Sequence, residues 1–109
     1  MSATYITAVF RYATHDDVYI DMRGLELCKE EAGFGKETVG LYVGGRRGVD
    51  EPWNYVVTVD GCVDAPSFAV QSMWDKFLEL AMERLKIKRL SVAVLSISDR
   101  GSVKEIGDV

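Results

Sequence analysis

The stretch from Pro66 to Leu85 constrains the fold more than any other part of the sequence, because its apolar residues recur at helical spacing. Every third or fourth position on one side is apolar: Val70, Met73, Trp74, Phe77, Ala81 and Leu85. Polar and charged residues fall on the opposite side. Burying one large apolar side chain contributes roughly 1.5–3 kcal/mol. The pattern therefore predicts one long amphipathic helix over about residues 66–86, packed against a broad apolar surface.

The start of this helix carries residues that favour capping. Asp64 and Ser67 can each accept a hydrogen bond from a free backbone N–H group, and Pro66 suits the first turn. We expect one of the two side chains to cap the helix.

The rest of the chain is predicted to supply the sheet. Alternating or continuous apolar residues predict five strands, over residues 5–12, 18–23, 38–43, 54–59 and 90–97. The first two are expected to form an antiparallel hairpin, and Asp60-Gly61 predicts a turn after the fourth. The last strand is apolar on both faces, which is typical of a strand in the middle of a sheet. The fourth strand, the long helix and the last strand resemble a split β-α-β unit.

Residues 24–32 fit two patterns. Leu25, Cys28 and Ala32 lie on one face of a short helix over about residues 25–32, which Gly33 would end in a left-handed conformation. The alternative is a continuation of the preceding strand. We favour the helix. The predicted fold is α+β, a single domain over residues 1–109 with about five mostly antiparallel strands, one long helix on one face, and a loose C-terminal tail at 99–109.

Composition narrows the class of partner. The chain of 109 residues has 13 Lys and Arg against 17 Asp and Glu, a net charge of −4. Because nucleic-acid binding depends on cationic contacts to phosphate, direct binding to nucleic acid is not expected.

Cys28 and Cys62 form no Cys-x-x-Cys pattern and are expected to be reduced thiols. No secretion signal or bilayer-spanning stretch is present, which predicts a cytoplasmic protein, or one in the host cytoplasm if it is viral, without a membrane partner.

The sequence offers little for catalysis or metal binding. The single histidine, His15, stands beside Asp16 and Asp17, where it could act as a general base, but the spacing places neither Cys28 nor Cys62 against it. Scattered carboxylates and one imidazole do not supply a metal site. We therefore expect no enzyme activity, no metal and no cofactor.

The segment from Gly44 to Trp53 is the most distinctive loop. Its glycines and Arg46 and Arg47 could approach an anion, but no Gly-Lys-Ser/Thr follows, so a phosphate-binding loop is not predicted. Arginine and tryptophan often anchor protein interfaces, and Arg46, Arg47 and Trp53 are candidate partner-binding residues. The alternative is a solvated surface loop.

Residues Leu41 to Gly45 (Leu-Tyr-Val-Gly-Gly) resemble the shorter aromatic strand motif of RNA-recognition-motif domains. The resemblance covers five residues, and the second motif of that family is absent. It implies at most a stacking role for Tyr42.

These observations favour a non-enzymatic protein-protein interaction module, a small regulator or stoichiometric inhibitor of a larger partner. By analogy of size and charge, anti-restriction and anti-CRISPR proteins of mobile elements are examples. Three acidic pairs could meet a basic channel of a nucleic-acid-handling partner: Asp16 and Asp17, Glu30 and Glu31, and Asp50 and Glu51. The alternative is that all three pairs are solvated loop charges.

Other functions stay open. If the sheet has one uncovered face, Tyr5, Tyr19 and Tyr42 are expected on it, where they could support a homodimer. The alternative function is a small ligand-binding domain or enzyme with a pocket between sheet and helix, using His15, Cys62 or Asp60. An RNA- or DNA-binding module stands third.

Overall fold

The structure is a computed structural model, which describes residues 3–14, 22–35, 39–45 and 55–99. Its elements follow the order strand, helix, strand, strand, helix, strand. They are β1 (Thr4–Thr14), α1 (Met22–Ala32), β2 (Val39–Gly45), β3 (Tyr55–Val63), α2 (Ser67–Arg84) and β4 (Ile87–Asp99).

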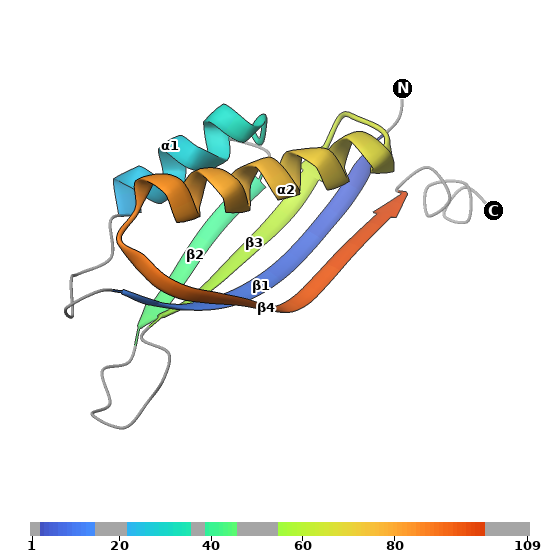
Figure 1. Cartoon of the computed structure of the whole chain (residues 1–109). Helices are drawn as coiled ribbons and strands as arrows, with labels where there is room; N and C mark the ends of the chain where they lie inside the picture. Colours follow the sequence, from blue (N-terminus) through green and yellow to red (C-terminus); the bar gives the residue numbers. More distant parts are fainter. Residues whose placement is uncertain (1–2, 15–21, 36–38, 46–54, 100–109) are drawn as a thin grey trace.

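The strands form one sheet in the order β2-β3-β1-β4, and each neighbouring pair is antiparallel. Both helices lie on the same face of this sheet (Figure 1). Because β3 and β4 are both antiparallel to β1, they run parallel to each other with β1 between them. The predicted split β-α-β arrangement of β3, α2 and β4 is therefore confirmed, as is the α+β class.

The described residues contain four strands, not about five, because β1 has no edge left for a hairpin partner. One edge of β1 pairs with β3 from Thr4↔Val63 to Tyr12↔Tyr55, and the other pairs with β4 from Thr4↔Asp99 to Thr14↔Ile87. The predicted hairpin is wrong. Met22 and Arg23, expected at the end of its second strand, begin α1 instead, and residues 15–21 lie outside the described residues.

The short helix is confirmed and is longer than expected at its start. Leu25, Cys28 and Ala32 are buried, as the helical pattern predicts. Gly33 follows with φ +110°, a conformation that L side chains rarely adopt, and its N–H donates to the Glu30 carbonyl oxygen at 3.0 Å.

The only charged side chain within the described core joins α1 to the start of β2. Lys29 is 1% exposed, and its Nζ donates a hydrogen bond of 2.6 Å to the carbonyl oxygen of Val39. The same ammonium lies 3.1 Å from Oε2 of Glu26, one turn earlier on α1. Pairing to an acceptor and to a carboxylate offsets the cost of burying the charge.

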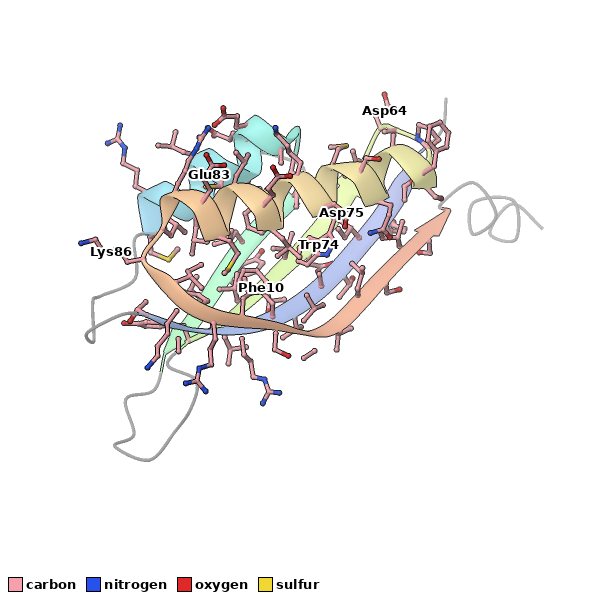
Figure 2. All side chains as sticks on the ribbon, viewed as in Figure 1. Phe10, Asp64, Trp74, Asp75, Glu83 and Lys86 are labelled. Atoms are coloured by element: carbon pink, nitrogen blue, oxygen red, sulfur yellow. The ribbon has the colours of Figure 1, made fainter. Side chains whose placement is uncertain are left out.

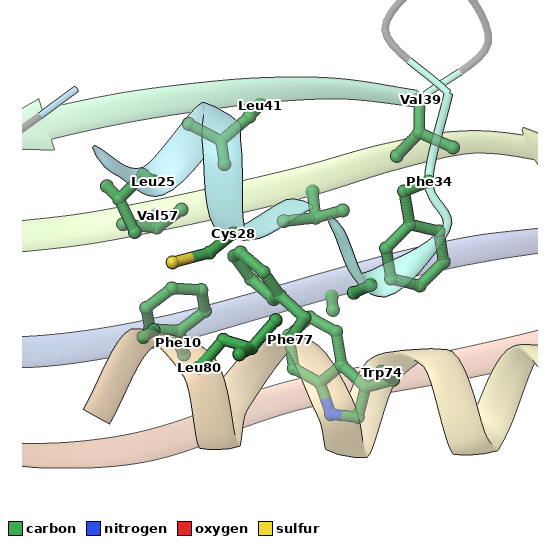
Figure 3. Close-up of a cluster of buried hydrophobic side chains, with 14 of the residues drawn as sticks. Phe10, Leu25, Cys28, Phe34, Val39, Leu41, Val57, Trp74, Phe77 and Leu80 are labelled. Atoms are coloured by element: carbon green, nitrogen blue, oxygen red, sulfur yellow. The ribbon is translucent and has the colours of Figure 1, made fainter. Parts of the chain in front are cut away.

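The predicted face of α2 packs onto the sheet. Val70, Trp74, Phe77 and Ala81 are buried, and so is Leu80, the residue before Ala81. Phe10 of β1 lies at the centre, with its ring centroid 6.0 Å from both the Trp74 and Phe77 rings. Side chains from both helices and from the sheet meet in this layer (Figure 3).

The predicted side-chain cap of α2 is wrong. Pro66 occupies the N-cap position, and no side chain bonds to the helix end there. The Pro66 carbonyl oxygen accepts the N–H groups of Ala69 and Val70 instead. The chain before the helix is held by Thr4, whose Oγ1 donates to the Ala65 carbonyl oxygen at 2.6 Å.

Two further expectations for the strands are wrong. Asp60-Gly61 is not a turn, since β3 continues to Val63 and its ladder with β1 runs through both residues. The last strand, β4, lies at the edge of the sheet rather than in its middle. Its register with β1 shifts between Val9 and Phe10, which leaves Ala93 as the extra residue of a bulge. Of the predicted tail at 99–109, Asp99 ends β4 and residues 100–109 lie outside the described residues.

Candidate interaction surface

The sheet face opposite the helices is covered by no helix or strand of the described chain (Figures 1 and 2). We call it the open face. Side chains alternate between the two faces along each strand, so the pairing registers show which residues lie on the open face. They are Tyr5, Thr7, Val9 and Arg11 of β1, Val56, Thr58, Asp60 and Cys62 of β3, Gly40, Tyr42 and Gly44 of β2, and Ser91, Val94, Ser96 and Ser98 of β4.

The middle of the open face is a row of largely apolar residues that runs across the four strands. The pairing places Tyr42, Thr58, Val9 and Val94 side by side, one from each strand. Tyr42 is 64% exposed and Val94 is 47% exposed, and Val56, in the next row, is 42% exposed. We call Tyr42, Thr58, Val9 and Val94 the central row.

Tyr42 lies against the sheet because its neighbour on the same face is a glycine. A Cβ atom built on Gly40 would stand 2.7 Å from the Tyr42 hydroxyl oxygen and 2.9 Å from Cε2 of its ring. The ring therefore occupies the space that a side chain at position 40 would take. The Tyr42 side chain therefore lies along β2 and does not project far from the open face.

Opposite charges lie on the two sides of the central row. On one side, Arg11 is exposed, and the exposed Arg89 pairs with Ala13 one row beyond. On the other side is Asp60, whose Oδ1 accepts a hydrogen bond of 3.0 Å from Oγ1 of Thr7. Because Thr7 pairs with Asp60, and Thr7 and Arg11 are both two residues from Val9 on β1, the backbone positions of Asp60 and Arg11 are equally far from the central row.

The structure describes few of the partner-binding residues predicted from the sequence. Arg46, Arg47, Asp50, Glu51, Trp53, Asp16 and Asp17 lie outside the described residues. Glu30 and Glu31 are exposed near the end of α1, in the helical layer and away from the open face. The described residues therefore bring none of these candidates together with the open face.

Glu31 is already paired within the chain. The Arg84 guanidinium donates to both of its carboxylate oxygens, with Nη2 at 3.0 Å from Oε1. This hydrogen bonding lowers the pKa of Glu31 below its ordinary value of 4.5 and raises the pKa of Arg84. The pair links the end of α2 to the end of α1.

The residues suggested for a pocket between sheet and helix lie elsewhere. Asp60 and Cys62 are on the open face, the opposite side of the sheet from α2, and His15 is outside the described residues. Within the described ranges, no three His, Cys, Asp or Glu side chains are grouped as a metal site would require. Neither described helix combines the length and hydropathy needed to span a bilayer.

Sequence reasoning found part of the open face. Tyr5 and Tyr42 lie on it as predicted, with Tyr42 on the edge strand β2, whereas Tyr19 is outside the described residues. Val56 and Val94 were missed as site residues. The alternation of β3 contains the signal for Val56, which lies within the predicted strand over residues 54–59, whereas the bulge at Ala93 obscures the facing of Val94.

No protein-family model and no curated protein matches the chain. Solved structures do resemble it. A dimeric ferredoxin-like protein of unknown function from Thermobifida fusca aligns with a TM-score of 0.50 and 11% identity, over 85% of this chain and 90% of that one. The protein YJCS aligns with a TM-score of 0.43 and 15% identity, over 87% and 100%. A dimeric protein of ferredoxin-like fold and unknown function from Bacteroides fragilis aligns with a TM-score of 0.39 and 12% identity, over 87% and 95%. The strand order of the sheet and the likeness to the Thermobifida fusca structure show a ferredoxin-like fold.

Proposed function

We propose that the protein is a non-catalytic protein-interaction module that acts by stoichiometric binding through its open face. The observation that carries the proposal is the exposure of Tyr42, Val56 and Val94 together on a sheet face that no described element covers. Exposed apolar residues gathered on one surface mark interaction sites more often than isolated ones do. Tyrosine suits such sites because it offers a large apolar ring with a polar tip.

The helical face of the same sheet supports this choice of surface. Phe10, Trp74 and Phe77 fill the layer between α2 and the sheet with ring centroids 5.7–6.0 Å apart. The Thermobifida fusca protein of the same fold is described as dimeric, so this architecture occurs in a protein that associates. A role as regulator or inhibitor of a larger partner stays a prediction from the sequence.

A photo-crosslinking experiment tests the surface. The photoreactive residue p-benzoylphenylalanine replaces Tyr42 on the open face or Phe68, which is 77% exposed on α2. We expect protein adducts from position 42 and none from position 68. The substitution Val94→Glu in the same row should abolish the adducts from position 42, whereas the control Lys76→Glu on α2 should leave them unchanged. Absence of adducts, or equal adducts from both positions, contradicts the proposal.

A further inference from the structure

The edges of the sheet are poorly suited to pairing with another strand, which leaves the open face as the broader binding surface. β4 carries the bulge at Ala93, and bulges interrupt the row of backbone groups that a new strand would need. β2 has seven residues, and Gly40, Gly44 and Gly45 are among them. Glycines weaken a strand and offer no side chains for packing.

The open face is large enough for a stable interface. Strands lie about 4.8 Å apart and rise about 3.4 Å per residue, so the paired part of the four strands covers roughly 20 Å by 30 Å. Two such faces together remove about 1,200 Å² from water, at the lower end of the range for specific interfaces. Because the Tyr42 ring lies over Gly40, it leaves room for another sheet, and two sheets pack face to face about 10 Å apart.

The charges on this face indicate its partner. Arg11 and Asp60 stand at equal distances on opposite sides of the central row. A two-fold axis along that row would place the Arg11 side of one copy over the Asp60 side of another, twice in the same interface. An axis along the strands would instead bring Arg11 of one copy close to Arg11 of the other, and like charges across an interface are unfavourable.

We infer that the partner of the open face is a second copy of this chain, packed about a two-fold axis that runs across the strands along the central row. This inference rests on the proposed function and names its partner. In the dimer Tyr42, Val9 and Val94 face the same residues of the second copy at the centre of the interface. Arg11 of each copy pairs with Asp60 of the other on either side.

Charge reversal tests this geometry through the mass of the assembly. Sedimentation velocity over a range of concentrations should give a species with twice the mass of the 12.1 kDa chain. Arg11→Asp alone places two carboxylates together and Asp60→Arg alone places two guanidinium groups together. Each reversal should weaken dimerisation about tenfold or more. Circular dichroism checks the fold, and Arg11→Gln and Asp60→Asn replace any reversal that unfolds, with a smaller loss expected.

Two rescue experiments identify the pairing between copies. The double variant Arg11→Asp, Asp60→Arg should recover the dimer, because each pair is restored with its charges exchanged. An equimolar mixture of the two single variants should form a mixed dimer in which both pairs are again opposite in charge. The matched control Glu79→Arg on α2, outside the proposed interface, should change neither the wild-type dimer nor the mixture.

Several outcomes would overturn the inference. These are a monomer throughout the range, a dimer that neither reversal weakens, or single variants that fail to associate on mixing. A monomer that crosslinks to a different protein from position 42 refutes the second copy as partner but leaves the proposed function standing. A monomer that binds labelled single-stranded RNA, with binding lost in Arg11→Asp, refutes both.

Discussion

The buried ammonium group of Lys29 donates a hydrogen bond of 2.6 Å to the carbonyl oxygen of Val39, the first residue of β2. This bond joins a helix to the start of a strand over a separation of ten residues. The carboxylate of Glu26 lies beside the same group at 3.1 Å. A single side chain thus partners two groups that would otherwise lose their interactions with water.

Replacing Lys29 should show how much these two contacts contribute to stability. Lys29→Met keeps a similar stem but leaves the Val39 carbonyl without its donor and the Glu26 carboxylate without the positive charge beside it. We expect the free energy of unfolding to fall by about 1–3 kcal/mol, the cost of leaving a buried polar group unsatisfied. Urea unfolding measures it, with Lys76→Met on the exposed side of α2 as the control, expected within about 0.5 kcal/mol of wild type. Equal losses in both variants would contradict this role.

The ion pair of Glu31 and Arg84 should give the protein a pH-dependent contribution to stability. Since the pKa of Glu31 is lowered in the folded protein, the contribution is complete above the ordinary value of 4.5. It is lost as pH falls from there through the lowered pKa. The urea midpoint of Glu31→Gln should therefore lie slightly below that of wild type at pH 7 and converge with it in acid.

The difference should also shrink in high salt, because the pair is exposed. Glu79→Gln, at an exposed position of α2, serves as control and should show no such convergence. A gap between wild type and Glu31→Gln that persists at low pH would argue against the ion pair as its cause.

Two phenylalanines of α2 should respond very differently to truncation. Phe77 is fully buried against Phe10 and Trp74, whereas Phe68 is 77% exposed at the start of the helix. Phe77→Ala should cost about 3–5 kcal/mol, since it removes buried area and leaves a cavity. Phe68→Ala should change stability by no more than about 0.5 kcal/mol. Thermal or urea unfolding of the two variants measures the difference. Similar losses of stability in both would contradict the packing of the Phe77 side of α2 against the sheet.

Gly33 and Gly44 form a second matched pair. Gly33→Ala forces a side chain into a backbone with φ +110° and brings its Cβ to 3.0 Å from Cε of Met73. We expect a loss of about 1–3 kcal/mol in the free energy of unfolding. Gly44 has an ordinary strand conformation with open space beside it, so Gly44→Ala should be neutral or stabilising by up to about 1 kcal/mol. A loss of stability in Gly44→Ala but not in Gly33→Ala would contradict this prediction.

Local patterns in the sequence predicted the helices and strands themselves better than they predicted which strands pair with each other. The apolar spacing of α2 and the alternation of β1 identify both elements and their buried faces, because one period repeats over many residues. The order of strands depends on contacts between distant segments, which no local pattern records. The hairpin was therefore expected beside β1, although β3 and β4 occupy both its edges.

The same limit applies to the open face. Alternation places Tyr5 and Tyr42 on it, since their strands are regular there. Asp60-Gly61 has the residue types of a turn, yet ladder hydrogen bonds with β1 hold it in β3. In β4 the bulge at Ala93 changes the facing of every later residue, which made an edge strand resemble a central one.

The central position of β1 also orders events during synthesis. β1 leaves the ribosome before β3 and β4, so it gains one neighbour when β3 emerges and the other only when β4, ending at Asp99, is complete. Contacts between such distant segments form slowly because a long loop must close first. Until then one edge of β1 is open to strands of other nascent chains, so the yield of folded protein should depend on how quickly β4 is synthesised.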